Sequence, residues 1–175
     1  MVILDATPLI YLATADRLEL LEHTDDQPVV PQAVYHEVGT TGLEAGHPDA
    51  RRVEQAVERG LLTVQPVDGS GLADRLRDNS NVSEADIAVI ALAAEEDDVA
   101  VMDDRYARST AKTEGVDTIG TVAVILNAVQ AGELAPEEAI DVVDTMIDAG
   151  WYCSTALYTR IVRTIRSLSD RGDAR

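Results

Sequence analysis

The segment Ser83–Arg108, SEADIAVIALAAEEDDVAVMDDRYAR, predicts a helix, a turn, a strand and a pair of aspartates in succession. Ser83 suits a helix N-cap, and Asp86 can close a capping box with it. The apolar residues that follow contain no Gly or Pro, and the run VAVM after an acidic turn is typical of a buried parallel strand. Asp103 and Asp104 come next, at the end of a strand where ligands and catalytic groups collect in open α/β sheets. Adjacent carboxylates repel each other there unless a cation or donor lies nearby.

The same alternation of strand and helix continues in both directions from this segment. Apolar runs predict strands at 2–4, 28–30, 61–67, 99–102 and 116–121. Helices are predicted between them, at 8–23, 31–38, 49–60, 72–77, 83–94, 105–114 and 122–130. A Gly-containing segment at 40–48 predicts a flexible connection. Strands that alternate with helices indicate α/β architecture, with one parallel or mostly parallel sheet covered on both faces.

The pattern changes to helices alone after Pro136, with one helix predicted at 136–150 and a second at 154–168. We therefore expect residues 1–131 to form one domain and residues 132–175 to form a helical extension packed on it.

Three aromatic residues of this extension are expected to pack its helices rather than to stack on bases: Trp151, Tyr152 and Tyr158. Three arginines share one face of the last helix and predict a solvated or interface surface: Arg160, Arg163 and Arg166.

Composition is that of an ordinary globular chain, with 175 residues of which 46% are hydrophobic and 26% charged. No apolar run approaches the length of about 18 residues that a membrane helix needs, and the N-terminus lacks a basic stretch before an apolar one. These features predict a soluble cytoplasmic protein with no membrane association. The single cysteine, Cys153, excludes an internal disulfide and a cysteine zinc cage.

Charge is the unusual property: 32 Asp and Glu against 14 Lys and Arg give a formal net charge of −18. Taken alone, this charge predicts repulsion of nucleic acid at low salt. The acids are nevertheless spread over the whole chain, and Lys112 is its only lysine. That pattern indicates a halophilic protein of a high-salt cytosol, where screening shortens electrostatic reach to a few ångströms. Total charge then does not decide which partner the protein binds.

Several carboxylates are predicted to meet at one edge of the sheet. Asp5 directly follows the strand at 2–4, and Asp103 and Asp104 follow the strand at 99–102. Asp86 lies in the first turn of a helix that leads to that strand, and Glu37 lies in the helix after the strand at 28–30. An all-oxygen ligand set suits Mg²⁺ or Mn²⁺ and not zinc. A metal so held can activate water and neutralise charge on a phosphodiester.

Each acid also has a plain structural explanation in so acidic a chain, as a solvated surface residue. Glu84 and Asp86 are two residues apart, about 200° around a helix, so only one of them can face inward. We favour Asp86, although a capping box accounts for it without a metal.

Polar and basic neighbours of the acids leave two alternatives each. Thr7 either orients a metal-bound water or caps the first helix. Arg105, Arg108 and Lys112 run along one helix face beyond the aspartate pair. They either hold phosphates beside a metal or offset the local acidic charge.

Four segments, in order, resemble the PIN-domain nucleases: MVILDATPLIYLA, PQAVYHEV, SEADIAVIALAAE and VAVMDDRYARSTAKTEG. The resemblance is greatest to the prokaryotic branch related to toxins of toxin–antitoxin pairs, and it covers about the first 125 residues. GTVAVILNAVQAGEL and the region 150–158 are similar to the helical tail of an archaeal and bacterial subgroup.

The resemblance implies an α/β/α sandwich around a parallel sheet, with a C-terminal helical pair. It also implies an endoribonuclease that uses Mg²⁺ or Mn²⁺ to hydrolyse phosphodiester bonds. By motif, the acids carried over are Asp5, Glu37, Asp86 and Asp104, with Asp103 beside the last. Glu84 matches an acid of the tailed subgroup and is a reserve metal ligand, and Thr7 matches the family's Ser or Thr.

The partners that the resemblance implies are RNA, an antitoxin protein and a second copy of the chain in a homodimer. A growth-arresting toxin and an RNA-processing enzyme both remain open. The main alternative is a non-catalytic PIN-fold module that binds RNA or protein. A haloacid-dehalogenase-type phosphatase needs an acid where this chain has Thr7, and a phospho-receiver needs a lysine at a strand end, whereas Lys112 lies on a helix.

Overall fold

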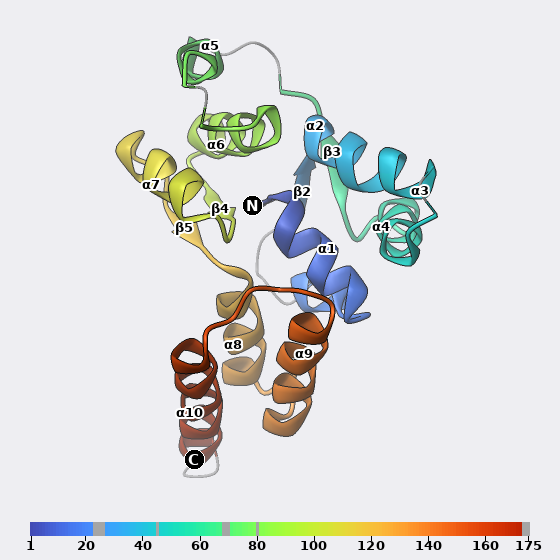
Figure 1. The fold of residues 1–175 in the computed structure, drawn as a ribbon, viewed down its shortest axis with the longest axis vertical. Helices are drawn as coiled ribbons and strands as arrows, with labels where there is room; N and C mark the ends of the chain where they lie inside the picture. Colours follow the sequence, from blue (N-terminus) through green and yellow to red (C-terminus); the bar gives the residue numbers. More distant parts are fainter. Residues whose placement is uncertain (23–26, 45, 68–70, 80, 173–175) are drawn as a thin grey trace.

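A computed structural model describes residues 1–22, 27–44, 46–67, 71–79 and 81–172 (Figure 1). Its centre is a five-stranded sheet in the order β3-β2-β1-β4-β5, and every strand pair is parallel. The strands are β1 (Val2–Leu4), β2 (Pro28–Pro31), β3 (Thr63–Gln65), β4 (Val99–Val101) and β5 (Thr118–Ile119). Helices flank this sheet, which confirms the predicted α/β/α sandwich with a parallel sheet.

The helices mostly follow the sequence predictions. Those of the sheet region are α1 (Ala6–Thr14), α2 (Gln32–Tyr35), α3 (Gly42–Glu44), α4 (Pro48–Glu58), α5 (Gly71–Arg77), α6 (Glu84–Glu96), α7 (Arg105–Thr113) and α8 (Thr121–Ala131). Two helices follow, α9 (Pro136–Asp148) and α10 (Thr155–Gly172). None of the helices in the described parts of the chain has the length and apolar character that crossing a membrane requires.

Two local predictions were wrong. The helix expected at 8–23 ends at Thr14, because Asp16 adopts a left-handed conformation (φ 56°) and a short 3-10 helix, η1 (Leu18–Leu21), follows. The flexible connection expected at 40–48 is helical through most of its described length. A π-helical segment, η2 (His36–Thr41), leads into α3 there.

Helix α6 is buried around most of its circumference, which explains why its sequence shows little polar face. It packs against β1, β2 and β4 on one side and against α2 and α5 on others. The capping box between Ser83 and Asp86 starts the helix, and Asp97 ends it in the left-handed conformation (φ 57°). The central stretch therefore anchors the fold, with Ile90 and Leu92 among its fully buried side chains.

The strand order creates a switch point between β1 and β4. The chain builds β1, β2 and β3 outward in one direction, and then returns to add β4 and β5 on the other side of β1. At such a point the connections leave the sheet on opposite sides, and a crevice opens outside the carboxyl ends of the two strands. Asp5 and Asp103 follow β1 and β4, so both lie at this crevice.

Helices α8, α9 and α10 form the lower part of the molecule in Figure 1. Helix α10 packs against both α8 and α9, and α9 also contacts α1. Ile161 and Ile165 of α10 are buried, with exposures of 3% and 0%. The division of the chain after residue 131 stays a prediction, but the last helices share a continuous apolar cluster with the sheet region.

We expect Ile165→Ala to lower the free energy of unfolding by about 2–5 kcal/mol, because it leaves a cavity in a fully packed position. Arg166→Ala, at an exposed position of the same helix, is the control and should change stability by less than about 0.5 kcal/mol. Denaturant unfolding followed by circular dichroism measures both. An unchanged main transition in Ile165→Ala would mean that the tail unfolds independently of the sheet.

Candidate active site

Asp5 is a buried carboxylate at the carboxyl end of the central strand. It occupies the N-cap position of α1, its side chain is 5% exposed, and its main-chain N–H donates to the carbonyl oxygen of Val101 (3.0 Å). Burial is the largest influence on its pKa, which rises from 3.8 to about 7 even though the main-chain N–H of Ala6 donates to the carboxylate and opposes the rise. A carboxylate in this position is costly to ionise without a compensating positive charge.

Three further acids surround Asp5, and each raises its pKa by electrostatic repulsion: Asp86, Glu37 and Asp103. They come from the start of α6, from η2 and from the end of β4, which are far apart in the sequence. The structure therefore brings together four of the predicted site residues, a group that we call the acid cluster. Their catalytic and metal-binding roles remain predictions.

Asp86 is part of the helix capping box and also lies at the acid cluster, the two roles that the sequence left as alternatives. Its Oδ2 accepts hydrogen bonds from the main-chain N–H (3.0 Å) and the hydroxyl (2.7 Å) of Ser83, which completes the capping box. Its half-buried carboxylate also lies close enough to Asp5 to raise the pKa of that group. Both of these bonds use Oδ2, so the capping box does not prevent Oδ1 of Asp86 from serving the acid cluster.

The two adjacent aspartates have different environments. Asp103 Oδ1 accepts from the main-chain N–H of Thr121 (2.8 Å), and its Oδ2 accepts from the Thr121 hydroxyl (2.8 Å) and from the indole N–H of Trp151 (3.0 Å). Asp104 is exposed and caps α7, because its Oδ1 accepts from the main-chain N–H groups of Tyr106 (2.9 Å) and Ala107 (2.8 Å). The structure thus brings Asp103 to the acid cluster and uses Asp104 as a helix cap.

Two other predicted residues lie apart from the acid cluster. Glu84 is exposed and pairs with the guanidinium of Arg77 (3.3 Å). Lys112 is exposed in the last turn of α7. Thr7 lies in the first turn of α1, two residues after Asp5, and it is not the cap of that helix, since Asp5 holds the N-cap position.

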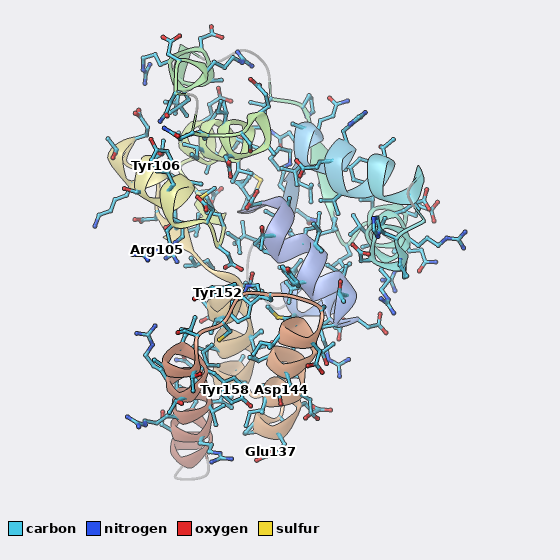
Figure 2. The ribbon with its side chains drawn as sticks, viewed as in Figure 1. Arg105, Tyr106, Glu137, Asp144, Tyr152 and Tyr158 are labelled. Carbon is cyan, nitrogen blue, oxygen red and sulfur yellow. The ribbon has the colours of Figure 1, made fainter. Side chains whose placement is uncertain are left out.

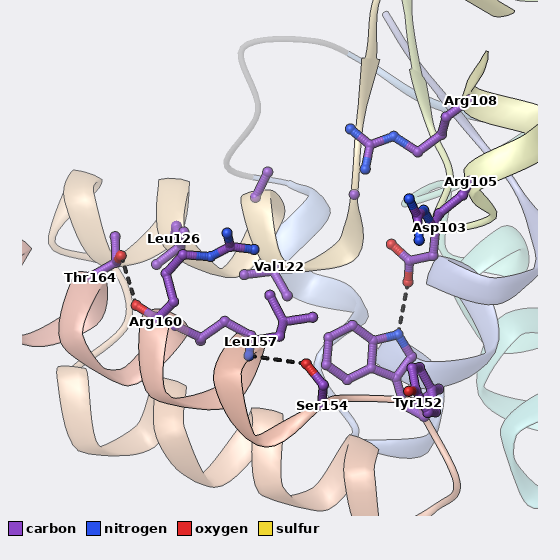
Figure 3. Close-up of a pocket in the computed structure, with 14 residues that line it drawn as sticks. Asp103, Arg105, Arg108, Val122, Leu126, Tyr152, Ser154, Leu157, Arg160 and Thr164 are labelled. Atoms are coloured by element: carbon purple, nitrogen blue, oxygen red, sulfur yellow. Dashed lines mark hydrogen bonds between the residues drawn. The ribbon is translucent and has the colours of Figure 1, made fainter.

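Arg105 and Arg108 lie beside Asp103 at the mouth of a cavity of about 700 Å³ between the sheet edge and α10 (Figure 3). Arg108 Nε donates to the Thr118 hydroxyl (3.3 Å). Lys112 does not line this cavity, so only two of the three predicted phosphate-binding cations reach it.

Thr121 and Trp151 are site residues that sequence reasoning missed. Thr121 is fully buried and Trp151 is 8% exposed, and both donate to Asp103. Trp151 packs in the core as predicted, but it also contacts the site, whereas the packing predicted for Tyr152 was wrong because that side chain is 86% exposed. The Gly-Thr pair at the start of α8 was the available sequence signal for Thr121.

The donor set of the acid cluster fits a hard divalent cation. All four members offer carboxylate oxygens, which Mg²⁺ and Mn²⁺ prefer, and a cation there would offset the burial and the repulsion that raise the pKa of Asp5. Within the described residues, no three Asp, Glu, His or Cys side chains already lie in the arrangement of a metal site. The cluster therefore has the right chemistry without a closed ligand cage.

A model of the PIN domain matches residues 1–167 of the sequence. The chain belongs to the PIN-domain family. PIN domains are generally nucleases and generally use divalent metal ions.

The PIN fold also occurs in a solved relative, a PilT N-terminus domain protein of the hyperthermophilic archaeon Sulfolobus solfataricus P2. It is similar with a TM-score of 0.52 and 15% sequence identity, over 70% of this chain and 88% of that one. This likeness supports the fold alone. Among curated proteins, none matches the chain.

We expect the stability of this PIN domain to fall as pH rises from about 4 to about 7, because the folded state keeps the Asp5 proton that the unfolded state has lost. The pKa values of 3.8 and about 7 correspond to a loss of up to about 4 kcal/mol above neutral pH. Asp5→Asn should remove this dependence. Urea unfolding of both proteins across that range, without divalent ions, measures it. Parallel profiles of stability against pH for wild type and Asp5→Asn would mean that Asp5 is not the source of the dependence.

Asp104→Ala should cost about 1 kcal/mol of stability through loss of the α7 cap, whereas Asp104→Asn should be nearly neutral because Asn also caps helices. Thermal unfolding of the two variants at equal ionic strength tests this. Equal destabilisation by both substitutions would mean that Asp104 contributes its charge and not a cap.

Proposed function

We propose that this PIN domain is a divalent-metal-dependent endoribonuclease that hydrolyses RNA phosphodiester bonds. One observation carries the proposal: Asp5 is buried at the switch point of the sheet beside three other acids, and burial first, then the repulsion of these acids, raises its pKa to about 7. A structural core does not need four carboxylates at one place, and their mutual repulsion lowers stability unless a cation offsets it. Perturbed groups of this kind concentrate at functional sites.

Asp5, Asp86, Asp103 and Glu37 are the residues that would hold Mg²⁺ or Mn²⁺. When bound there, the ion would supply Lewis-acid stabilisation of phosphate charge and an activated water. In this assignment the fourth acid of the family pattern is Asp103, and Asp104 has the separate task of starting α7.

The residues of the chain would divide the work of orienting the reaction. Asp103 is held by three donors from Thr121 and Trp151, so the direction of its carboxylate is set before any substrate arrives. Arg105 and Arg108 lie beside Asp103 and can donate hydrogen bonds to the phosphates on either side of the phosphate that is cleaved. The bond from Arg108 to Thr118 restrains that guanidinium.

A non-catalytic PIN module that binds RNA or protein is the competing function, and it would retain the fold without metal-dependent cleavage. Membership of a toxin–antitoxin pair, a role in RNA processing, an antitoxin partner and a homodimer stay predictions from the family resemblance.

We expect Asp5→Asn to abolish both Mn²⁺ binding and Mn²⁺-dependent cleavage of RNA. Loss of an outer partner of a metal ligand already costs roughly 10–100-fold, and loss of a ligand itself should cost more. Titration calorimetry and cleavage of a mixed RNA pool, both in concentrated KCl, measure the two effects on the folded protein.

The matched control is Asp141→Asn, which removes one charge at an exposed position of α9, away from the acid cluster. It should bind and cleave like the parent. Cleavage by Asp5→Asn at the parental rate would place the site elsewhere. Absence of Mn²⁺ binding and of RNA cleavage in all three proteins would support the non-catalytic module.

A further inference from the structure

The cavity beside Asp103 has an unusual composition for this chain. Its volume is about 700 Å³, and among its fourteen lining residues are three arginines and one acid: Arg105, Arg108, Arg160 and Asp103. The whole chain carries 32 acidic against 14 basic side chains, so this local excess of positive charge reverses the general balance. The single acid, Asp103, already accepts three hydrogen bonds from the protein.

The three arginines are available to an anionic ligand. Within the described residues, the arginines that form ion pairs are others: Arg17, Arg52, Arg75 and Arg77. Figure 3 shows Arg105 and Arg108 near Asp103, and Arg160 on the far side of the cavity, with Val122 and Leu157 between them and Leu126 beside Arg160. Positive groups therefore stand at two ends of an apolar floor.

Aromatic side chains from the loop before α10 complete the cavity. Trp151 is buried and fixed by its bond to Asp103, whereas the neighbouring Tyr152 is 86% exposed at the rim. A large aromatic side chain exposed to this degree has no packing role in the described structure. Aromatic rims beside positive groups are how proteins hold unpaired bases, by stacking the base and contacting the backbone.

We propose that this cavity binds one unpaired nucleotide of the RNA next to the acid cluster, and that the C-terminal helical tail supplies the binding residues Tyr152 and Arg160. Tyr152 stacks on the base, and Arg160 contacts a phosphate opposite those reached by Arg105 and Arg108. Asp103 lines the cavity and is also a member of the acid cluster. A nucleotide in the cavity therefore lies next to the phosphodiester bond that the acid cluster would cleave. The proposal rests on the proposed function for the identity of the polymer.

The volume is adequate for this occupant, because pockets for ligands of nucleotide size are about 300–1,000 Å³. A cavity that accepts a base must receive it unstacked and unpaired, which a duplex does not offer without opening. The tail would then act as a positioning element for the substrate, and not as a separate appendage of the domain.

The test measures binding of a short single-stranded RNA to the full chain in EDTA, where metal-dependent cleavage does not occur. Fluorescence anisotropy of labelled RNA gives the affinity of wild type, Tyr152→Ala, Arg160→Ala and the control Arg163→Ala. The shared face predicted for the three arginines of this helix was wrong for Arg160, because Arg163 and Arg166 line a different surface. The Arg163 variant therefore removes the same charge outside the cavity. Quenching of Trp151, the only tryptophan of the chain, reports binding at the cavity itself.

We expect Tyr152→Ala and Arg160→Ala each to weaken binding roughly ten-fold or more, as loss of a stacked base or a phosphate contact does. Arg163→Ala should stay within about two-fold of wild type. Arg160→Ala should also reduce the slope of log affinity against log salt by about 0.7, the value for one phosphate contact to a single strand, whereas Tyr152→Ala should leave the slope unchanged.

The outcomes separate this inference from the proposed function. Affinities of all three variants equal to wild type, or RNA binding without Trp151 quenching, would overturn the nucleotide pocket even if Mn²⁺-dependent cleavage persists. Binding that depends on Tyr152 and Arg160 without any cleavage would keep the pocket and overturn the nuclease. No binding of single-stranded RNA to the wild type would overturn the pocket. Circular dichroism of each variant checks its fold, which these exposed positions should not disturb.

Discussion

Three hydrogen bonds to the Asp103 carboxylate hold the candidate site together. They join the end of β4 to the start of α8 and to the loop before α10, and Trp151 reaches Asp103 across 48 positions of sequence. Bonds to a charged acceptor contribute about 1.5–3 kcal/mol each. Gly120 is needed at this junction, because a Cβ there would lie 2.9 Å from Asp103 Oδ1. The C-terminal helices are therefore connected to the sheet edge by the same carboxylate that faces Asp5.

Asp5 and Asp103 form a complementary pair of environments. Asp103 has its negative charge stabilised by protein donors, whereas Asp5 is buried with a single opposing contact, from the N–H of Ala6. Burial and three neighbouring acids raise its pKa to about 7. Among the described residues, Asp5 forms no ion pair. Arg105 and Arg108 line the cavity beside Asp103 (Figure 3), and Figure 2 shows Arg105 above the C-terminal helices. A cation among the carboxylates would compensate the negative charge around Asp5, and a phosphate in the cavity would compensate the positive charge of the arginines.

The sequence predicted the sheet because its strands lie in short, largely apolar runs, of which β1 and β2 are buried throughout. It predicted Asp5 because that acid directly follows β1. The 3.6-residue helical repeat showed that Glu84 and Asp86 cannot both face inward, and the structure places the favoured one, Asp86, beside Asp5. Between Asp103 and Asp104 no period applies, because they lie between a strand and a helix. The sequence prediction took Asp104 as the fourth acid of the site, although an aspartate immediately before a helix also suits an N-cap, which is its position in the structure. Contacts such as Trp151 to Asp103 depend on tertiary packing that no local pattern encodes.

The acidic surface and the three arginines of the cavity are compatible once salt is considered. At about 1 M salt the screening length is only about 3 Å, so the net charge of −18 has little influence on a polyanion beyond contact distance. Steering by total charge is then replaced by contacts made at van der Waals and hydrogen-bond range. Stacking on an aromatic ring survives in salt, and so do arginine contacts in a partly enclosed cavity. In the high-salt cytosol that the composition predicts, a nucleic-acid-binding protein would gain more from an exposed tyrosine and a few well-placed arginines than from a broadly basic face, and Tyr152 and three arginines line the cavity beside Asp103.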